Sequence, residues 1–141
     1  MMNEHRTGLR IGLPLLMTVL LMVACSGGGG TDSAGAPAGA PKAIEAYLQA
    51  RVKADVDKMI SLSCADWEAK ARVEATSAKS QNEQLQGLAC QLGQTDGTAQ
   101  LVKCDGKILS AYNGETRERN LAELTFRAVS DGGEWRMCGY K

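Results

Sequence analysis

Two carboxylates near a tyrosine are the residues of this chain whose types best suit acid–base chemistry. Asp105 and Glu115 flank a predicted strand that carries Tyr112. A carboxylate in an apolar cavity beside a phenol can take a proton from a substrate carbon and return it, as isomerases and lyases require. Both carboxylates, however, stand next to glycines, Gly106 and Gly114, and such turns are usually solvated. The sequence therefore favours surface positions for them, and we assign no catalytic residue.

Histidine chemistry depends on a single residue, because the chain has only one histidine, His5. His5 lies in a segment that we expect to be cleaved. The mature chain would then lack the base of Ser-His-Asp and Cys-His catalysis. It would also lack the ligand of histidine-based zinc sites.

Three aromatic residues, Trp67, Tyr112 and Phe126, are the candidates for lining a small apolar pocket. The alternative is that the large aromatic side chains, Trp67 and Trp135 among them, simply pack the core, which is the commoner role of such residues. The sequence favours core packing.

The N-terminus is typical of an exported protein. Arg6 and Arg10 precede a nearly uninterrupted apolar run, residues 11–23, which is too short for a comfortable membrane span. This predicts a signal peptide over residues 1–24. The run Leu-Met-Val-Ala before Cys25 resembles a bacterial lipobox, with Met22 where leucine is usual. The resemblance implies a diacylglyceryl group on Cys25, cleavage before it, and acylation, for instance by palmitate, of the new N-terminus; the alternative is a plain secretory signal.

The segment after Cys25 has the composition of a linker. Residues 26–41 contain only Ser, Gly, Ala, Pro, Thr and Asp, so they offer no side chains for a core. We therefore expect a tether over residues 25–41 and one small domain over residues 42–141. Such a chain would lie outside the cytoplasm, anchored to the cell membrane by lipid at Cys25.

Charge excludes some partners. The chain has 16 basic and 16 acidic residues, and removal of Arg6, Arg10 and Glu4 with the signal peptide leaves 14 basic and 15 acidic residues. Nucleic-acid binding needs a basic patch, so none is expected. Contact with a membrane should depend on the lipid rather than on charge. No cofactor and no metal site is indicated.

The pattern of the domain predicts helices first and strands after them. Helical spacing of apolar residues runs from about residue 41 to residue 79 and divides into three helices, the third over 64–79 with Ser63 as its cap. Alternation and turn signals then predict strands at 88–92, 98–112, 121–129 and 134–140, the second of them with a bend at residues 105–106. The charged run at 117–119 reads as a solvated loop. This order predicts an α+β fold, with three N-terminal helices packed on a curved four-stranded antiparallel meander.

Several segments within residues 42–141 resemble a group of small bacterial lipoproteins with a nuclear-transport-factor-2-like (cystatin-like, ketosteroid-isomerase-like) cone domain. The matching segments are Ser63–Glu68, Leu88–Cys90, Cys104–Ile108, Ala111–Glu115 and Gly133–Tyr140. The resemblance implies a conical α+β fold but no defined activity, because this superfold carries isomerases, dehydratases and binding modules alike.

The four cysteines that remain after Cys25 predict two disulfides, because an even number in a small exported domain usually means pairing. A four-cysteine zinc site and four free thiols are the alternatives, although no C-x₂-C pair is present.

The hairpins select the pairing. A turn at residues 96–97 places Cys90 opposite Cys104, and the later turns place Phe126 between Cys104 and Cys138. Those two cysteines would then be two strands apart, about 9–10 Å, which is too far for a disulfide. The sequence therefore predicts the pairs Cys90–Cys104 and Cys64–Cys138.

Two functions follow as expectations. The first is a non-enzymatic binding or interaction module at the cell envelope, whose partner is an envelope protein or a small apolar ligand. The second is a ketosteroid-isomerase-like isomerase or lyase with a carboxylate base. A carboxylate that faces inward into a pocket would favour the second.

Overall fold

The computed structural model of this chain describes residues 38–141. The predicted signal peptide, the predicted lipid acceptor Cys25 and nearly all of the predicted tether lie outside these residues. The first helix, α1 (Gly39–Val52), begins inside the segment expected to belong to the tether. Ala40 is fully buried, so the last residues of that segment belong to the fold.

The helical layer contains α1, α2 (Val56–Ser61), the 3-10 turn η1 (Ala65–Trp67) and α3 (Glu68–Ser80). In α1 the apolar stripe Ile44, Tyr47 and Leu48 is buried, as its spacing predicts. Among the described helices, none is long and apolar enough to span a membrane.

The start of the third helix differs from the prediction. The turn η1 comes first, and α3 begins at Glu68 rather than Cys64. Ser63 does not cap it: the Ser63 hydroxyl donates to the carbonyl of Met59, 2.7 Å away, and so closes the end of α2. A serine after a short helix can satisfy a free carbonyl as readily as it can start a new helix.

The sheet has five antiparallel strands rather than four. They are β1 (Gln84–Asp96), β2 (Ala99–Tyr112), β3 (Glu115–Asn120), β4 (Phe126–Asp131) and β5 (Glu134–Tyr140), with the turn η2 (Leu121–Glu123) before β4. The order is β1-β2-β4-β5, and β3 pairs with the second half of β2. The charged segment expected to be a loop is therefore strand β3, and the sheet is not a simple meander.

A bulge bends the long β1–β2 hairpin at the place where the sequence suggests a bend. The register between β1 and β2 shifts between Gln86 and Ala89, opposite Gly106. Gly106 has φ +104°, and a Cβ there would lie 2.5 Å from the carbonyl oxygen of Gln86. Only glycine fits such a contact, so this residue fixes the position of the bend.

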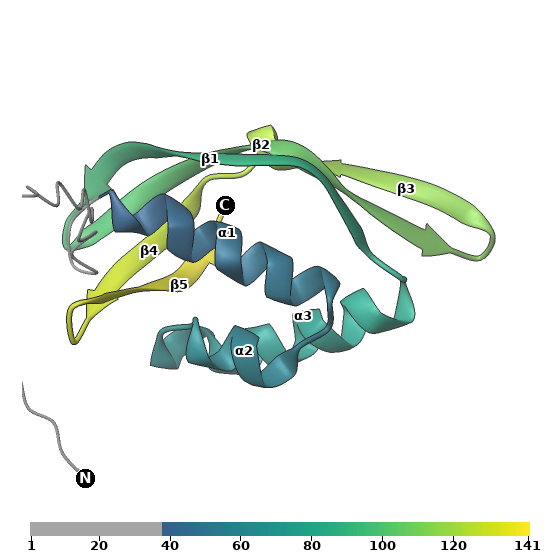
Figure 1. Ribbon diagram of the computed structural model, residues 1–141, viewed down its shortest axis with the longest axis horizontal. Coiled ribbons are helices and arrows are strands. Elements are labelled where there is room, and N and C mark those ends of the chain that lie inside the picture. The colour runs from purple at the N-terminus through teal and green to yellow at the C-terminus, as the bar shows by residue number, and fades with distance from the viewer. Residues whose placement is uncertain (1–37) are drawn as a thin grey trace, which may run out of the picture. The chain divides into compact units, whose positions relative to one another are not determined.

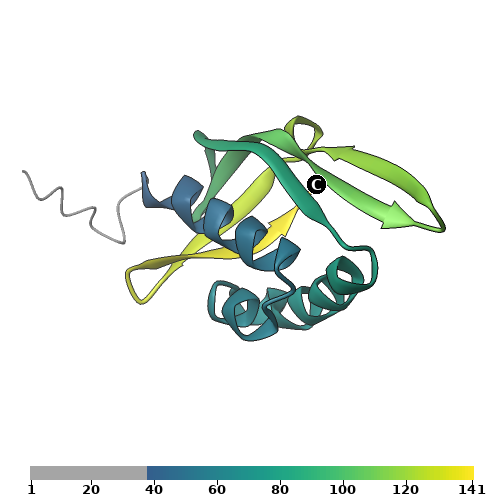
Figure 2. The ribbon, with the colours of Figure 1, turned by 45° about the vertical axis from the view of Figure 1, so that its right-hand side comes forward.

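The bent sheet curves around α1, while α2 and α3 pack on the side of α1 that faces away from β1 (Figure 1). Figure 2 shows the same layers and shows the β2–β3 hairpin extending beyond the helices. The core between the layers is apolar; its largest buried side chains are Tyr47, Phe126, Ile44, Leu48, Met59, Leu121, Met137 and Val102.

Both disulfides have the expected partners. Cys90 is joined to Cys104, its register partner across the hairpin, and Cys64 is joined to Cys138. The zinc-site and free-thiol alternatives are therefore wrong for this structure. Cys64 lies beside the edge of β5 rather than above the sheet, because its N–H donates to the carbonyl of Met137 at 2.9 Å.

Two of the predicted registers are wrong. Phe126 pairs with Val102 instead of Cys104, because β3 and η2 lie between β2 and β4, where the prediction has one hairpin turn that leads directly into the next strand. On its other side Phe126 pairs with Tyr140 instead of Cys138, because an irregularity shifts the β4–β5 ladder between Phe126 and Ala128.

Candidate functional site

The carboxylates singled out by the sequence lie at the surface. Glu115 pairs with Tyr112 at the end of the β2–β3 hairpin, and Glu115 is exposed. Tyr112 is 50% exposed, with the guanidinium of Arg117 5.3 Å from its ring centre. Asp105 is also exposed, opposite Ala89. Neither carboxylate lies in an apolar cavity, so neither has the surroundings that the acid–base hypothesis requires.

The aromatic residues proposed for a pocket do not come together. Phe126 is buried, and both Phe126 and Trp67 pack against Tyr140, with ring centres 5.7 and 5.6 Å away. Tyr112 lies apart from them, at the hairpin end. Trp67 and Phe126 are therefore core packing residues, which is the interpretation that the sequence favours.

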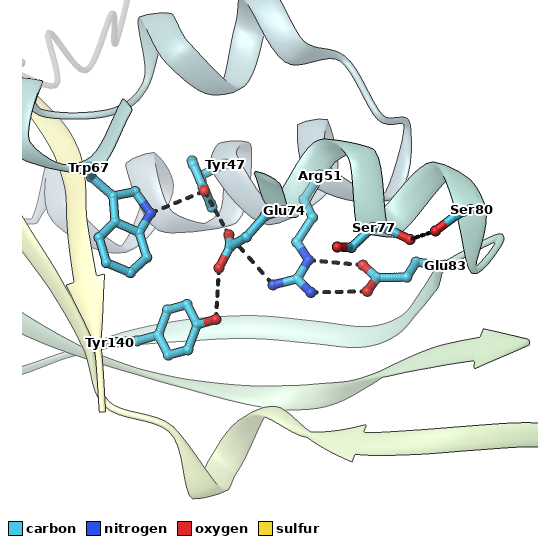
Figure 3. A network of polar contacts seen from close by, with 8 residues as sticks. All are labelled: Tyr47, Arg51, Trp67, Glu74, Ser77, Ser80, Glu83 and Tyr140. Carbon is cyan, nitrogen blue, oxygen red and sulfur yellow. Dashed lines mark hydrogen bonds and ion pairs between the residues drawn. The ribbon is translucent and has the colours of Figure 1, made fainter. Parts of the chain in front are cut away.

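A buried carboxylate that the sequence analysis missed lies at the centre of a polar network (Figure 3). The side chain of Glu74, on α3, receives a hydrogen bond from the hydroxyl of Tyr47 at 2.8 Å and another from the hydroxyl of Tyr140 at 2.7 Å. The first bond goes to Oε2 and the second to Oε1, so each carboxylate oxygen has its own donor. Trp67 Nε1 in turn donates to the hydroxyl of Tyr47 at 3.1 Å.

A buried arginine extends this network. Arg51, on α1, donates through Nε and Nη2 to the two oxygens of Glu83, at 2.8 and 2.9 Å. Its third nitrogen, Nη1, lies 3.6 Å from Oε2 of Glu74. Arg51, Glu74 and Glu83 are all buried, so two carboxylates share one guanidinium away from water. Paired carboxylate–arginine bonds of this geometry are among the strongest side-chain hydrogen bonds.

The ionisation of the network follows from its burial. Burial raises the pKa of Tyr47 well above its ordinary value, and the charge of Glu74 raises it further. Burial also raises the pKa of Tyr140, together with its hydrogen bond to Glu74. For Arg51, burial alone would lower the pKa, but the bonds to Glu83 and the charge of Glu74 raise it. Both tyrosines therefore stay neutral donors, and Arg51 stays charged.

The missed residues do have a signal in the sequence. Arg51 continues the stripe of Ile44, Tyr47 and Leu48 along α1, and Glu74 lies on the stripe of small residues along α3. Opposite charges at inward positions of two neighbouring helices indicate a buried ion pair. That inference needs the two helices to be packed together, which the spacing alone does not establish.

Next to the network lies a groove of about 190 Å³ that is open to solvent. We call it the α3–β3 groove. Its floor consists of the buried residues Arg51, Glu74 and Glu83 and the half-buried Tyr140, and its rim consists of Lys70, Val73, Ser77, Gln81 and Arg119. In the described part of the chain, no three His, Cys, Asp or Glu side chains are grouped as metal ligands would be.

Comparison with known proteins gives a fold. A candidate dehydratase of the NTF2-like (nuclear-transport-factor-2-like) family from Streptomyces avermitilis is similar with a TM-score of 0.51 and 17% identity, over 70% of this chain and 88% of that one. This domain has an NTF2-like fold. An NTF2-like protein with a cystatin-like fold from Novosphingobium aromaticivorans is also similar, with a TM-score of 0.48 and 10% identity, over 69% of this chain and 73% of that one.

The expected resemblance is thus confirmed at the level of the NTF2-like fold. No protein-family model matches the chain, and no curated protein is significantly similar to it. Identities this low carry the fold and no activity, so the function of this NTF2-like domain must be argued from its own side chains.

Proposed function

We propose that this chain is an exported, lipid-anchored protein whose NTF2-like domain is a non-enzymatic binding module at the cell envelope. The observation that carries the proposal is the state of Glu74. Both of its oxygens accept tyrosine hydroxyls, and Arg51 lies close to it. A carboxylate held in this way is not free to take a proton from a substrate, because each of its oxygens already accepts a hydrogen bond from a tyrosine hydroxyl and Arg51 lies beside it.

The binding site that we propose is the α3–β3 groove. This groove lies directly beside the polar network, and hydrogen-bonded side chains of the network form its floor. A floor fixed by internal hydrogen bonds suits recognition, since little conformational entropy is lost when a ligand is bound.

The location outside the cytoplasm is supported by the two disulfides. Bonds such as Cys64–Cys138 and Cys90–Cys104 persist in oxidising compartments and are rare in the cytosol. Together with the predicted signal peptide and the lipid acceptor Cys25, they support a domain that is tethered to the membrane. Its partner would then be an envelope protein or a small molecule outside the cytoplasm.

One observation favours the alternative function, an isomerase or lyase. Glu74 is a buried carboxylate that borders an open groove and has two tyrosines beside it, which is the set of groups that such chemistry uses. In this alternative Glu74 takes the role first considered for Asp105 and Glu115. Tyr47 or Tyr140 would have to release a carboxylate oxygen before Glu74 could accept a proton.

Proton exchange in D₂O separates the two functions. The lipoprotein, purified in detergent, is incubated with a β,γ-unsaturated ketosteroid and with simple ketones, and loss of the α-proton signals is followed by NMR. We expect no exchange above the rate without protein. Acceleration that disappears in the Glu74→Gln variant but persists in Glu123→Gln, an exposed glutamate, would overturn the proposal in favour of an enzyme.

A further inference from the structure

We propose that the α3–β3 groove binds a small oxyanion, a carboxylate or phosphate group, through Lys70 and Arg119. This inference rests on the proposed function, because it names the class of ligand for the same groove. Some charged groups around the groove already have partners within residues 38–141, and two do not.

The two carboxylates of the groove already have hydrogen-bond partners. Glu83 takes two hydrogen bonds from Arg51, and each oxygen of Glu74 takes one from a tyrosine, Tyr47 or Tyr140 (Figure 3). A ligand that brings hydrogen-bond donors, such as an ammonium group, would have to break these bonds in a buried site. Breaking one partner of a buried charged network is costly, so the floor disfavours a cation.

The charged groups of the groove that have no ion pair in the described part of the chain are both cations. Lys70 projects from α3 and Arg119 from β3, so two cations approach the groove from opposite elements. Both are exposed, and neither forms an ion pair within residues 38–141. By contrast, Lys107 on the same hairpin is paired with Glu118 at 2.8 Å.

The direction of Arg119 follows from the strand register. Arg119 lies directly opposite Ile108, which is buried on the face of the sheet that the helices cover. Partners in an antiparallel pair point to the same side, so Arg119 also leaves the sheet on that face, toward α3. An arginine and a lysine facing each other across a groove can share one oxyanion, the arginine through two N–H bonds.

The charge balance points to the same class of ligand. The groove is lined by three cations, Arg51, Lys70 and Arg119, and by two carboxylates, Glu74 and Glu83, which leaves one positive charge. The mature chain as a whole has one negative charge more than positive charges, so the sign of the groove is opposite to that of the protein. Its volume of about 190 Å³ is below the range of about 300–1,000 Å³ typical of drug-sized ligands, so the ligand should be small.

The test uses the lipoprotein in detergent and two probes, inorganic phosphate and succinate. Each is titrated at constant ionic strength, adjusted with NaCl, and binding is followed by tryptophan fluorescence and by the thermal midpoint. We expect saturable binding of at least one probe in the millimolar range or tighter. Tighter binding of phosphate or of succinate identifies which kind of oxyanion the groove prefers.

Matched variants locate the site. Lys70→Ala with Arg119→Ala should weaken binding about tenfold or more, because both charged hydrogen bonds are lost. Arg72→Ala with Lys79→Ala removes the same charge from exposed positions of α3 that do not line the groove, and binding should change less than twofold. Lys70→Arg should retain binding. All four positions are exposed, so unchanged thermal midpoints without ligand should confirm folding.

Two results would overturn the inference: no saturable binding of either probe, or equal weakening in the two double variants. Neither result bears on proton exchange. If the probes fail and no exchange occurs, the oxyanion inference is wrong while the non-enzymatic proposal stands; if exchange occurs, the proposed function fails whatever the probes do.

Discussion

At the scale of single residues, the buried network shows why a charge pair can lie inside so small a domain. Arg51 and Glu74 come from different helices, and each would be costly to bury alone. The hydroxyls of Tyr47 and Tyr140 and the carboxylate of Glu83 supply the remaining hydrogen bonds. Such a network adds little net stability over apolar packing, but removing one member is expensive because the others stay buried.

Glu74→Gln tests this directly. The substitution keeps the volume, removes the charge next to Arg51, and replaces one acceptor with a donor between two tyrosines. We expect a loss of about 2–4 kcal/mol in the free energy of unfolding, measured by denaturant titration of tryptophan fluorescence. The control Glu123→Gln, at an exposed position, should change stability by less than about 0.5 kcal/mol. Equal, small effects of the two variants would show that the network is not structural.

The tyrosines of the network should make stability fall at alkaline pH. The pKa of Tyr140 is raised by burial and by its bond to Glu74, and the pKa of Tyr47 is raised for the same kinds of reason. The unfolded chain releases these protons near pH 10, whereas the folded chain keeps them, so stability is complete below about pH 10 and declines above it.

The Tyr140→Phe variant keeps the ring and removes one titrating hydroxyl. The free energy of unfolding is measured between pH 9 and 11, at conditions where unfolding is reversible. Its decline with pH should be shallower in this variant than in the wild type, by up to about 1.4 kcal/mol per pH unit. Tyr112→Phe, which removes the hydroxyl of an exposed tyrosine outside the network, serves as the matched control. An unchanged slope in Tyr140→Phe would contradict the account.

At the scale of elements, each edge of the sheet is covered in a different way. The edge of β5 bonds the segment before η1, where Met137 N–H donates to the carbonyl of Leu62 at 2.7 Å. On β1, the N–H of Cys90 donates to the side chain of Glu45 from α1 at 2.8 Å. The edge strand β3 carries alternating charges instead, which discourage pairing with another chain. The charge run therefore protects an edge, and a run of this kind is compatible with a strand as well as with a loop.

The two disulfides should contribute unequally to stability. Cys64–Cys138 closes a separation of 74 residues, and Cys90–Cys104 closes one of 14 residues. By chain entropy the first should contribute about 4–5 kcal/mol and the second about 3 kcal/mol. Each pair is replaced by serine and the free energy of unfolding is measured by denaturant titration. The loss should be larger for the first pair.

Non-reducing peptide mapping checks the pairing itself, and a peptide that joined Cys64 to Cys90 would contradict the fold.

What the sequence could predict depended on how local each feature is. The Cys90–Cys104 pair follows from one short turn, and it was predicted correctly. The two strand partners of Phe126 depend on β3, on η2 and on an irregularity in β5. No local apolar pattern in the sequence marks these features, so both predicted partners are wrong. Cys64–Cys138 was still correct, because it followed by elimination from the distance between strands rather than from the faulty register.

The candidate site was the least predictable part for the same reason. Asp105 and Glu115 are the sequence candidates because they flank the segment that carries Tyr112, yet Asp105 lies at an exposed position of β2 and Glu115 at the exposed start of β3. Glu74 and Arg51 meet only when α1 and α3 pack together. Alternation and periodicity describe one element at a time, so a site made from several elements is visible only in the assembled fold.

At the scale of the whole molecule, the chain combines an anchor predicted from the sequence with a small disulfide-bonded domain. A domain of about 100 residues buries a limited fraction of its surface, so two covalent links and a buried ion network are useful reinforcements outside the cytoplasm. Placing the domain on a lipid anchor would keep its groove at the envelope, where ligands or partners are encountered.

The intact mass of the native protein, extracted from the membranes of its host, tests this account most directly. We predict a chain that begins at Cys25, carries a diacylglyceryl group with an acylated N-terminus, and is four hydrogens lighter than the fully reduced chain because of its two disulfides. The Cys25→Ser variant should keep the precursor mass or leave the membrane fraction. A wild-type chain that lacks lipid on Cys25, or one with four free thiols, would contradict the account.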